Sequence, residues 1–261
     1  MKSLMAGWIG LALLLCISRC LKGEEGEILV SGRTMEVGKY KVTIEPSGRI
    51  REVRRDGIIL LERLGLFAYP VGSGRLSQGG NPPECIEKVT TPTRFLQETG
   101  KFIIRREAIL GNEKFSEGVK YSYKAVFDPG GKINIAYEVE YLVSEKWRAY
   151  AGEFIYRIPL VSIAGKGWIA EMRDGAVNSG VNPSVFNEEN RKEWVHIDNG
   201  ARLFLETGVG QVELIAEGKS YLRGGIEGDG TAIYVISLPR EPQLPAGTKQ
   251  SLQLTIVLPA K

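Results

Sequence analysis

The sequence predicts an all-β fold, built as a large antiparallel β-sandwich. The stretch 40–62 contains three short strands and two tight turns, which leaves no room for a helix. Apolar and polar residues alternate over 133–141 and again over 252–258, as expected of half-buried strands. Glycine and proline interrupt the chain about every 8 to 12 residues, and no repeat of fixed period appears, which favours a sandwich over a propeller or a solenoid.

The stretch 40–62 predicts the first three strands. Apolar residues alternate with polar ones over 40–45, Pro46-Ser47-Gly48 turns the chain, and Arg55-Asp56-Gly57 turns it again before the apolar run 58–61. Its arginines are interleaved with acidic residues and are expected to form a solvated strand face: Arg49, Arg51, Arg54 and Arg55.

The later strands follow from the same alternation. Asp128-Pro129-Gly130-Gly131 is predicted to be a hairpin turn that pairs 133–141 with 121–127. A strand over 154–158 should stop at Pro159, because proline lacks the N–H that a ladder needs. Only 187–192 could form a turn or two of helix.

Residues 1–23 are predicted to be a secretory signal peptide, with Lys2 ahead of an apolar run over 4–17 and small residues after it. The run is too short to span a membrane comfortably. Cleavage after Ser18 and cleavage after Cys20 both satisfy the small-residue preference, and both remain open. Residues 24–261 are predicted to form a single domain.

Lipidation of Cys16 or Cys20 is the alternative processing route, because an apolar run that ends in cysteine begins bacterial lipoproteins. Leu15 and Arg19 depart from the small residue that such a signal carries before its cysteine. A membrane association is therefore expected only through this lipid anchor.

The mature chain is expected to be close to neutral. Loss of residues 1–23 removes Lys2, Arg19 and Lys22 from the 34 basic residues and none of the 31 acidic ones. Nucleic-acid binding depends on neutralising phosphates, so a chain without net positive charge or a basic tail is not expected to bind nucleic acid.

Cys85 is the only cysteine certain to remain after processing, so no intramolecular disulfide framework is expected and Cys85 itself should be a small buried residue. One histidine, one cysteine and scattered acids give no metal-ligand spacing. The glycine-rich stretches 71–80 and 207–213 open no helix whose amides could cradle a phosphate. No cofactor and no metal are therefore expected.

The order of the elements resembles the β-supersandwich of the galactose mutarotase-like superfamily. The resemblance rests on PSGRI and RRDG in the first meander, the hairpin YSYKAVFDPGGKINIAYEVEY, the strand AGEFIYRIPL and the closing LPAGTKQSLQLTIVLP. That superfamily also supplies β-domains to glycoside hydrolases, polysaccharide lyases and periplasmic glucan-biosynthesis proteins. A tandem of immunoglobulin-like sandwiches is the alternative fold.

The resemblance implies a chemistry that this chain matches only in part. Epimerase members use a histidine as general acid and a glutamate as general base, a second histidine, and an early Gly-Arg-x-x-Asn-Arg stretch that binds sugar hydroxyls. Here Gly74 and Arg75 match, the Asn-Arg half is missing, and His196 is the only histidine. The resemblance therefore implies a member that is not an epimerase.

The candidate binding site lies in the long stretch from Trp168 to His196, which is rich in Gly, Asn and Arg. Aromatic faces stack on the apolar faces of sugar rings, and planar polar groups bind hydroxyls. The predicted carbohydrate-binding residues are Arg75, Trp168, Arg173, Asp174, Trp194 and His196. The competing interpretation is that the two tryptophans close the ends of the sandwich. Trp147 is a further stacking candidate or, in the competing interpretation, a cap on the core.

The functional expectation is an exported, periplasmic or extracellular protein that binds carbohydrate or a glycan-processing protein and is not itself catalytic. One alternative is a sugar-active enzyme, an epimerase or a lyase, that uses His196 with Glu206, Glu213 or Glu227. The other is a structural or assembly subunit of an envelope complex.

Overall fold

The structure is a computed structural model that describes residues 28–31, 33–70, 74–80, 85–227, 230–237 and 243–260. The predicted signal peptide, its cleavage sites and its two cysteines lie outside the described residues. Trp147 belongs to a strand, but its side chain also lies outside the described part.

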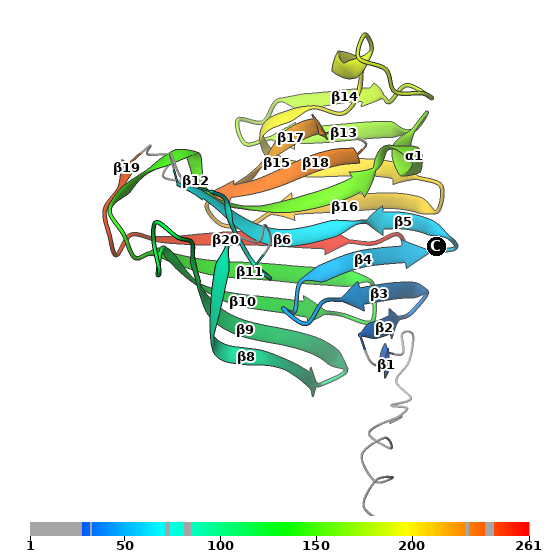
Figure 1. Cartoon of the computed structure of the whole chain (residues 1–261). Helices are drawn as coiled ribbons and strands as arrows, with labels where there is room; N and C mark the ends of the chain where they lie inside the picture. Colours follow the sequence, from blue (N-terminus) through cyan, green and yellow to red (C-terminus); the bar gives the residue numbers. More distant parts are fainter. Residues whose placement is uncertain are drawn as a thin grey trace, which may run out of the picture.

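The fold is all-β, as predicted, and consists of two antiparallel sheets (Figure 1). The smaller sheet is a meander in chain order: β1 (Ile28–Ser31), β2 (Thr34–Val37), β3 (Tyr40–Ile44), β4 (Ile50–Arg55) and β5 (Ile58–Leu61). It packs through β4 and β5 against β6 and β12 of the larger sheet.

The larger sheet runs in the order β7-β6-β12-β18-β17-β15-β16-β20-β11-β10-β9-β8, while β13 pairs with β14 and β15, and β19 pairs with β12. Its strands are β6 (Arg63–Pro70), β7 (Leu76–Ser77), β8 (Ile86–Glu98), β9 (Lys101–Gly111), β10 (Val119–Phe127), β11 (Lys132–Tyr141), β12 (Glu145–Pro159), β13 (Gly167–Met172), β14 (Val177–Val181), β15 (Ile197–Thr207), β16 (Gly210–Ala216), β17 (Ser220–Glu227), β18 (Gly230–Ser237), β19 (Gln243–Leu244) and β20 (Lys249–Val257).

The first meander and the central hairpin form where the sequence predicts them. Asp56 and Gly57 take φ angles of 50° and 81°, the left-handed conformation that a two-residue hairpin turn requires. The Asp128 carboxylate accepts a hydrogen bond from the Gly130 amide (3.0 Å), which closes the turn between β10 and β11. Local turn chemistry thus sets the register of both hairpins.

Of the four arginines in and just before β4, two are exposed as predicted and two are not. Arg51 and Arg54 are exposed, but Arg49 and Arg55 are each 7% exposed, so the expectation of a solvated face is wrong for these two. The pairing of β3 with β4 skips Arg51, and this bulge changes which side of the strand the following residues face. The Arg55 guanidinium then lies inside, where it donates to the Pro259 carbonyl (2.9 Å).

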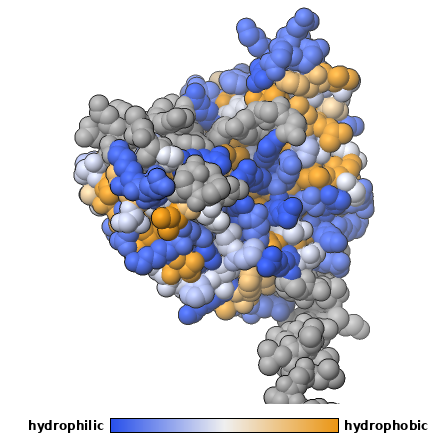
Figure 2. Space-filling view, in the orientation of Figure 1, coloured by the Kyte–Doolittle hydropathy of each residue, from blue (hydrophilic) through white to orange (hydrophobic). Residues whose placement is uncertain are grey.

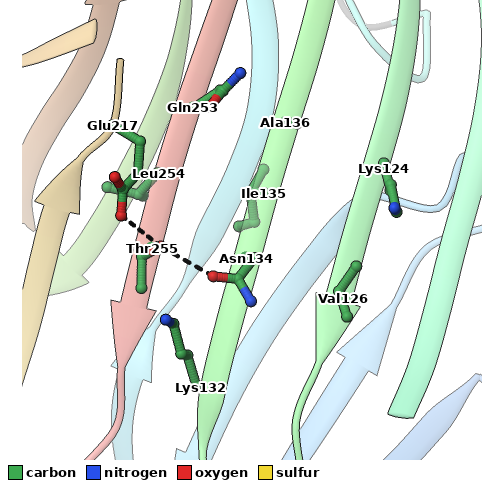
Figure 3. A pocket seen from close by; sticks show the side chains of 10 residues that line it. All are labelled: Lys124, Val126, Lys132, Asn134, Ile135, Ala136, Glu217, Gln253, Leu254 and Thr255. Carbon is green, nitrogen blue, oxygen red and sulfur yellow. Dashed lines mark hydrogen bonds between the residues drawn. The ribbon is translucent and has the colours of Figure 1, made fainter. Parts of the chain in front are cut away.

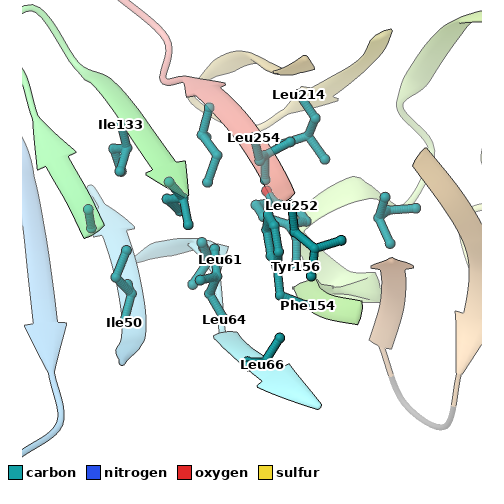
Figure 4. Close-up of a cluster of buried hydrophobic side chains, with 14 of the residues drawn as sticks. Ile50, Leu61, Leu64, Leu66, Ile133, Phe154, Tyr156, Leu214, Leu252 and Leu254 are labelled. Atoms are coloured by element: carbon teal, nitrogen blue, oxygen red, sulfur yellow. The ribbon is translucent and has the colours of Figure 1, made fainter. Parts of the chain in front are cut away.

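The core lies between the two sheets and is drawn in Figure 4. Ile50 and Leu61 come from the smaller sheet, and they meet Leu64, Tyr156 and Leu254 of the larger one. All five side chains are 1% exposed or less. Burying such side chains contributes about 1.5 to 3 kcal/mol each, so this layer supplies the main stabilisation that a fold without a disulfide framework needs.

Two further predictions are tested by the described strands. Cys85 is buried, as expected, and its thiol exchanges hydrogen bonds with the Ser77 backbone. The helical content is small, as expected, but differently placed: α1 (Leu160–Ile163) follows Pro159, and a single 3₁₀ turn, η1 (Arg191–Glu193), lies at the end of the stretch 187–192.

The stretch from Trp168 to His196 is more regular than predicted. Its first part forms the hairpin of β13 and β14, and only 182–196 is irregular. The alternation was weak in the sequence because β14 pairs with β13 alone, which leaves side chains such as Val177 and Val181 exposed.

The surface carries hydrophobic side chains in two areas of Figure 2, at the upper right over α1, β13 and β14, and at the lower left over β8. They are Val161, Ile169, Val177 and Val181 in the first area and Ile86, Val89 and Phe95 in the second. β8 is the end strand of the sheet, and its pairing with β9 is interrupted between Val89 and Arg94, around Pro92. Among the described residues, no helix has the length and apolar character needed to cross a bilayer.

Candidate functional site

The outward side of β6, β12, β18 and β17 carries the candidate site, and we call it the arginine face. Leu64 of β6 points into the core, in a row that continues through Tyr156 to Ile233. Side chains alternate along a strand, so Arg63 points the other way. Arg63 is paired with Arg157, and the same outward row continues through Ala232 to Gly225.

Phe67 is the apolar centre of this face. It is 0% exposed but is not part of the main core, because it lies on the side of β6 opposite Leu64 and Leu66. The guanidinium carbon of Arg63 lies 5.4 Å from the centre of its ring, and that of Arg75 lies 4.7 Å from it. Both distances are within the range of cation–π contacts, so one aromatic ring interacts with two guanidinium groups.

The charge on Arg63 is opposed by its surroundings. Burial lowers the pKa of its guanidinium, and the positive charges of Arg49, Arg75 and Arg157 lower it further, against a smaller opposite effect of Glu45. The side chains of Arg63 and Arg75 are only partly exposed, so solvent screens this repulsion incompletely. A cluster of this kind stabilises an anion placed beside it.

Arg49 frames the edge of the face and has its own counterion. Its guanidinium makes two hydrogen bonds of 2.8 Å to the Glu45 carboxylate. Its side chain lies over Gly65, where a Cβ would come within 2.5 Å of the Arg49 Cδ. Position 65 must therefore be glycine for this arginine to cross β6 as it does.

A cleft containing His196 borders the opposite side of the arginine face. Its volume is about 510 Å³, and it is lined by Arg191, Lys192, Val195, His196 and 224–226. The imidazole occupies the space above Gly225, where a Cβ would lie 3.0 Å from Nδ1. The lining residues include two cations and a histidine but no carboxylate.

Arg75 and His196 therefore border the same face but do not meet. Arg63, beside Arg75, is separated from Gly225, below His196, by three strand spacings, or about 14 Å. Arg75 and His196 were both predicted from the sequence to contact carbohydrate, and the structure places them at the two sides of one surface.

The remaining predicted site residues lie elsewhere. Trp194 is 1% exposed, its indole N–H donates to Asn190 Oδ1 (3.1 Å), and its ring meets Phe186 edge-on. A ring so enclosed cannot stack on a ligand in this conformation, which agrees with the competing interpretation of a core tryptophan. Trp168 packs its indole against Gly180 of β14, where a Cβ would lie 3.0 Å from Nε1.

Arg173 and Asp174 hold the turn between β13 and β14. The Arg173 guanidinium donates to the carbonyls of Gly218 (2.7 Å) and Ser220, and the Asp174 carboxylate accepts from the Ala176 amide (3.0 Å). These contacts give both residues a structural role. The six predicted residues thus do not converge on a single site.

A buried polar network occupies the place where the resemblance implies the Asn-Arg half of the sugar-binding stretch. Gln78 donates to the Ser47 carbonyl (3.1 Å) and accepts from the Tyr137 hydroxyl (2.7 Å). The next residue, Gly79, has φ of 85°, a conformation that arginine rarely adopts, and its amide donates to Glu87 (3.2 Å). The position serves the fold rather than a ligand.

Glu87 carries the network further into the sheet. It pairs with Arg106 at 2.6 Å, and it accepts a hydrogen bond from the Tyr121 hydroxyl, also at 2.6 Å. Burial alone would lower the pKa of Arg106, but Tyr121 and Glu87 outweigh burial and raise it. We call Glu87, Arg106 and Tyr121 with Gln78 and Tyr137 the buried network.

A second hollow, of about 300 Å³, lies on the outward side of β10, β11 and β20 (Figure 3). The Thr255 hydroxyl donates to Asn134 Oδ1 (2.9 Å) or to Glu217 Oε1 (3.1 Å). Lys124 and Lys132 stand around it. No described aromatic side chain lines this hollow, so it offers no ring face on which a sugar could stack.

The described residues contain no cluster of three or more His, Cys, Asp or Glu side chains with the arrangement of a metal site.

Comparison with known proteins identifies the fold. The galactose 1-epimerase from Lactobacillus acidophilus NCFM superposes with a TM-score of 0.52 and 9% sequence identity, over 89% of this chain and 93% of that chain. A galactose mutarotase related enzyme from Lactobacillus acidophilus superposes with a TM-score of 0.44 and 8% identity, over 89% of this chain and 96% of that chain. No family model and no curated protein sequence matches this chain.

Proposed function

We propose that this chain, which has a galactose mutarotase-like fold, binds carbohydrate on its arginine face and does not catalyse a reaction on it. The observation that carries the proposal is the grouping of Arg63 and Arg75 around the Phe67 ring on an outward sheet face. Guanidinium groups held by an aromatic ring keep N–H donors at their edges, and such donors fit sugar oxygens.

The described side chains around His196 form no proton-transfer pair, which supports a binding role. Anomer interconversion needs one group that gives a proton and another that takes one, both within hydrogen-bond reach of the same sugar. His196 is the only histidine of the sequence, and the residues that line its cleft include no carboxylate.

The carboxylates that the sequence offered as partners are engaged elsewhere. Glu206 accepts a hydrogen bond from the Gly167 amide (3.0 Å), and Glu213 pairs with Arg202 (2.8 Å). The side chain of Glu227 lies outside the described residues. An epimerase or lyase that uses His196 therefore gains no support from Glu206 or Glu213.

The cellular setting of the proposal rests on the sequence. Residues 1–23 have the pattern of a signal peptide, so we place the mature protein in the periplasm or outside the cell, with a lipid anchor on Cys16 or Cys20 as the variant form. The partner is carbohydrate; a glycan-processing protein, or an envelope complex that uses this chain as a subunit, is the competing partner.

A glycan array with the mature chain tests the binding role. We expect a set of oligosaccharides to bind, and we expect Arg63→Ala combined with Arg75→Ala to abolish the signal while circular dichroism shows a folded protein. Arg54→Ala is the matched control, because Arg54 is an exposed arginine paired with Glu52 on another sheet. A blank array with the folded wild-type chain would refute the binding role.

An NMR measurement of anomer exchange tests the second half of the proposal. Wild-type protein should not accelerate the interconversion of α- and β-anomers of galactose or glucose. An acceleration that disappears in His196→Ala would show that the protein is an enzyme and that the proposal is wrong.

A further inference from the structure

The arginine face contains more positive charge than the described carboxylates around it neutralise. Three of the arginines around it have carboxylate partners: Arg49 pairs with Glu45 (2.7 Å), Arg157 with Glu62 (3.5 Å) and Arg223 with Asp198 (3.5 Å). At the centre of the face, the described side chains place no carboxylate within ion-pair distance of Arg63 or Arg75.

The positions of these two guanidinium groups are set by packing. The guanidinium carbons of Arg63 and Arg75 lie 5.4 and 4.7 Å from the centre of the Phe67 ring, and Phe67 is itself completely buried. The sheet register adds a like charge beside Arg63, because Arg157 is its direct cross-strand neighbour. Like charges opposite each other in a sheet are unfavourable, and Glu62 offsets the charge of Arg157 but does not pair with Arg63. A ligand that supplies negative charge beside Arg63 would relieve the remaining repulsion.

Arginine has a particular chemical preference that narrows the ligand. Its planar guanidinium presents five N–H donors and no acceptor, and it binds carboxylate, sulfate and phosphate oxygens with two parallel hydrogen bonds. A neutral sugar hydroxyl is both a donor and an acceptor, whereas a guanidinium can only donate to it.

We propose that the ligand of the arginine face is an acidic carbohydrate, whose carboxylate, sulfate or phosphate group is bound by Arg63 and Arg75. This inference rests on the proposed carbohydrate-binding function and specifies its ligand class.

The dimensions of the face indicate an oligosaccharide. About 14 Å separate the row position of Arg63 from that of Gly225, beside which the His196 cleft opens. Lys192 lines that cleft, and Arg191 lines it too but is paired with Glu188 at 2.8 Å. A chain of several acidic sugars would place one acidic group at Arg63 and Arg75 and a later one near Lys192.

One acidic residue belongs to the same face by its register. Glu153 of β12 is the cross-strand partner of Phe67. The side chain of Glu153 lies outside the described residues.

Calorimetric titration of the mature chain with matched ligands tests the inference. Trigalacturonate and its fully methyl-esterified form share the same rings, and esterification replaces each negative charge with a neutral methyl ester. We expect trigalacturonate to bind about tenfold more tightly or better, and we expect added salt to weaken its binding. Dextran sulfate oligomers against dextran, and glucose 6-phosphate against glucose, separate carboxylate from sulfate and phosphate as the recognised group.

Arg63→Gln combined with Arg75→Gln should remove the preference for the acidic member of each pair, and Arg54→Gln should keep it. The outcomes separate the two proposals. Equal binding of acidic and neutral forms by the wild-type chain would overturn the acidic ligand and leave carbohydrate binding intact. Binding of inorganic sulfate or phosphate alone, without any sugar, would leave the anion site and overturn the carbohydrate function. Failure of every sugar and anion to bind would overturn both.

Discussion

Arg63 and Arg106 are both arginines of the larger sheet that are partly withdrawn from water, and their environments have opposite effects. In the buried network, Tyr121 and Glu87 raise the pKa of Arg106 above its usual value in spite of burial. On the arginine face, burial and neighbouring arginines lower the pKa of Arg63. Among the described side chains, Arg106 has a carboxylate partner in Glu87 and Arg63 has none. Charge that is paired inside the protein serves the structure, and charge left without a partner points to a ligand.

High pH should destabilise the protein through its buried tyrosines, of which Tyr121 and Tyr137 belong to the buried network, and this is the largest effect we expect. Burial raises the pKa of the hydroxyl in Tyr121, Tyr123, Tyr137, Tyr141 and Tyr156 above the ordinary value of 10.0. A group with a raised folded-state pKa contributes its full stability below the unfolded pKa and loses it as pH rises toward the folded pKa. The free energy of unfolding should therefore fall above pH 10, by about 1.4 kcal/mol per pH unit for each such tyrosine.

Urea unfolding between pH 8 and pH 12, followed with tyrosinate absorbance at 295 nm, measures this fall. The buried tyrosines should ionise together with unfolding. Their ionisation in a protein that is still folded would contradict the burial of the network.

Glu87→Ala should lower the free energy of unfolding by about 3 to 5 kcal/mol, because it leaves Arg106 as a buried charge without its partner. Glu87→Leu combined with Arg106→Met should recover much of this loss, since the double change removes both charges. Chemical denaturation of the three proteins provides the measurement, and a double variant as unstable as the single one would argue against a paired role.

Arg106→Met and Arg63→Met compare the two regions directly. The first should cost about 3 kcal/mol because it leaves Glu87 buried and unpaired. The second should change stability by less than about 1 kcal/mol, or increase it, because it removes a repelled charge. Equal losses in urea denaturation would show that Arg63 is a structural residue.

Tyr137→Phe and Tyr123→Phe give the smallest and finest comparison. The Tyr137 hydroxyl donates to Gln78 (2.7 Å), whereas the Tyr123 hydroxyl is buried and the structure shows no hydrogen-bond partner for it. Loss of the first should cost about 1 to 2 kcal/mol, and loss of the second should cost almost nothing or stabilise the protein. Differential scanning calorimetry of both variants measures the difference, and Tyr137→Phe should melt at the lower temperature. A lower melting temperature for Tyr123→Phe would contradict this assignment.

The parts of the fold that could be predicted are those set by neighbours in sequence. Alternation over 133–141 and the turn Asp128-Pro129-Gly130-Gly131 specify β10 and β11 through local chemistry. Arg55 was misplaced because a bulge at Arg51 depends on how β3 and β4 pair, and Arg49 because its side chain lies over Gly65 of the other sheet. Alternation within one strand contains neither feature. The prediction that these arginines are exposed used only neighbouring residues in the sequence, whereas their burial depends on contacts with other strands.

The site was harder to predict for a related reason. Arg75 and His196 were singled out, but Arg63 and Phe67 were not, although a signal exists: β6 has leucine at 64 and 66 on one side and Arg63, Gly65 and Phe67 on the other. A strand that is apolar on one side and carries a charge beside glycine and an aromatic residue on the other is a candidate for binding. Trp194 appeared to be a stacking residue, and its packing against Phe186 could be seen only in three dimensions.

The irregular edge strand around Pro92 affects the tendency of the protein to aggregate. A strand at the end of a sheet is a template onto which another chain can add, and repeated addition produces fibrils. β8 is such a strand, thirteen residues long with three exposed hydrophobic side chains. Pro92 has no N–H to donate to an added strand, and the pairing of β8 with β9 is irregular around it. Replacing Pro92 with a β-branched residue would restore a backbone N–H at this edge. We expect this variant to aggregate at concentrations at which the natural chain remains in solution.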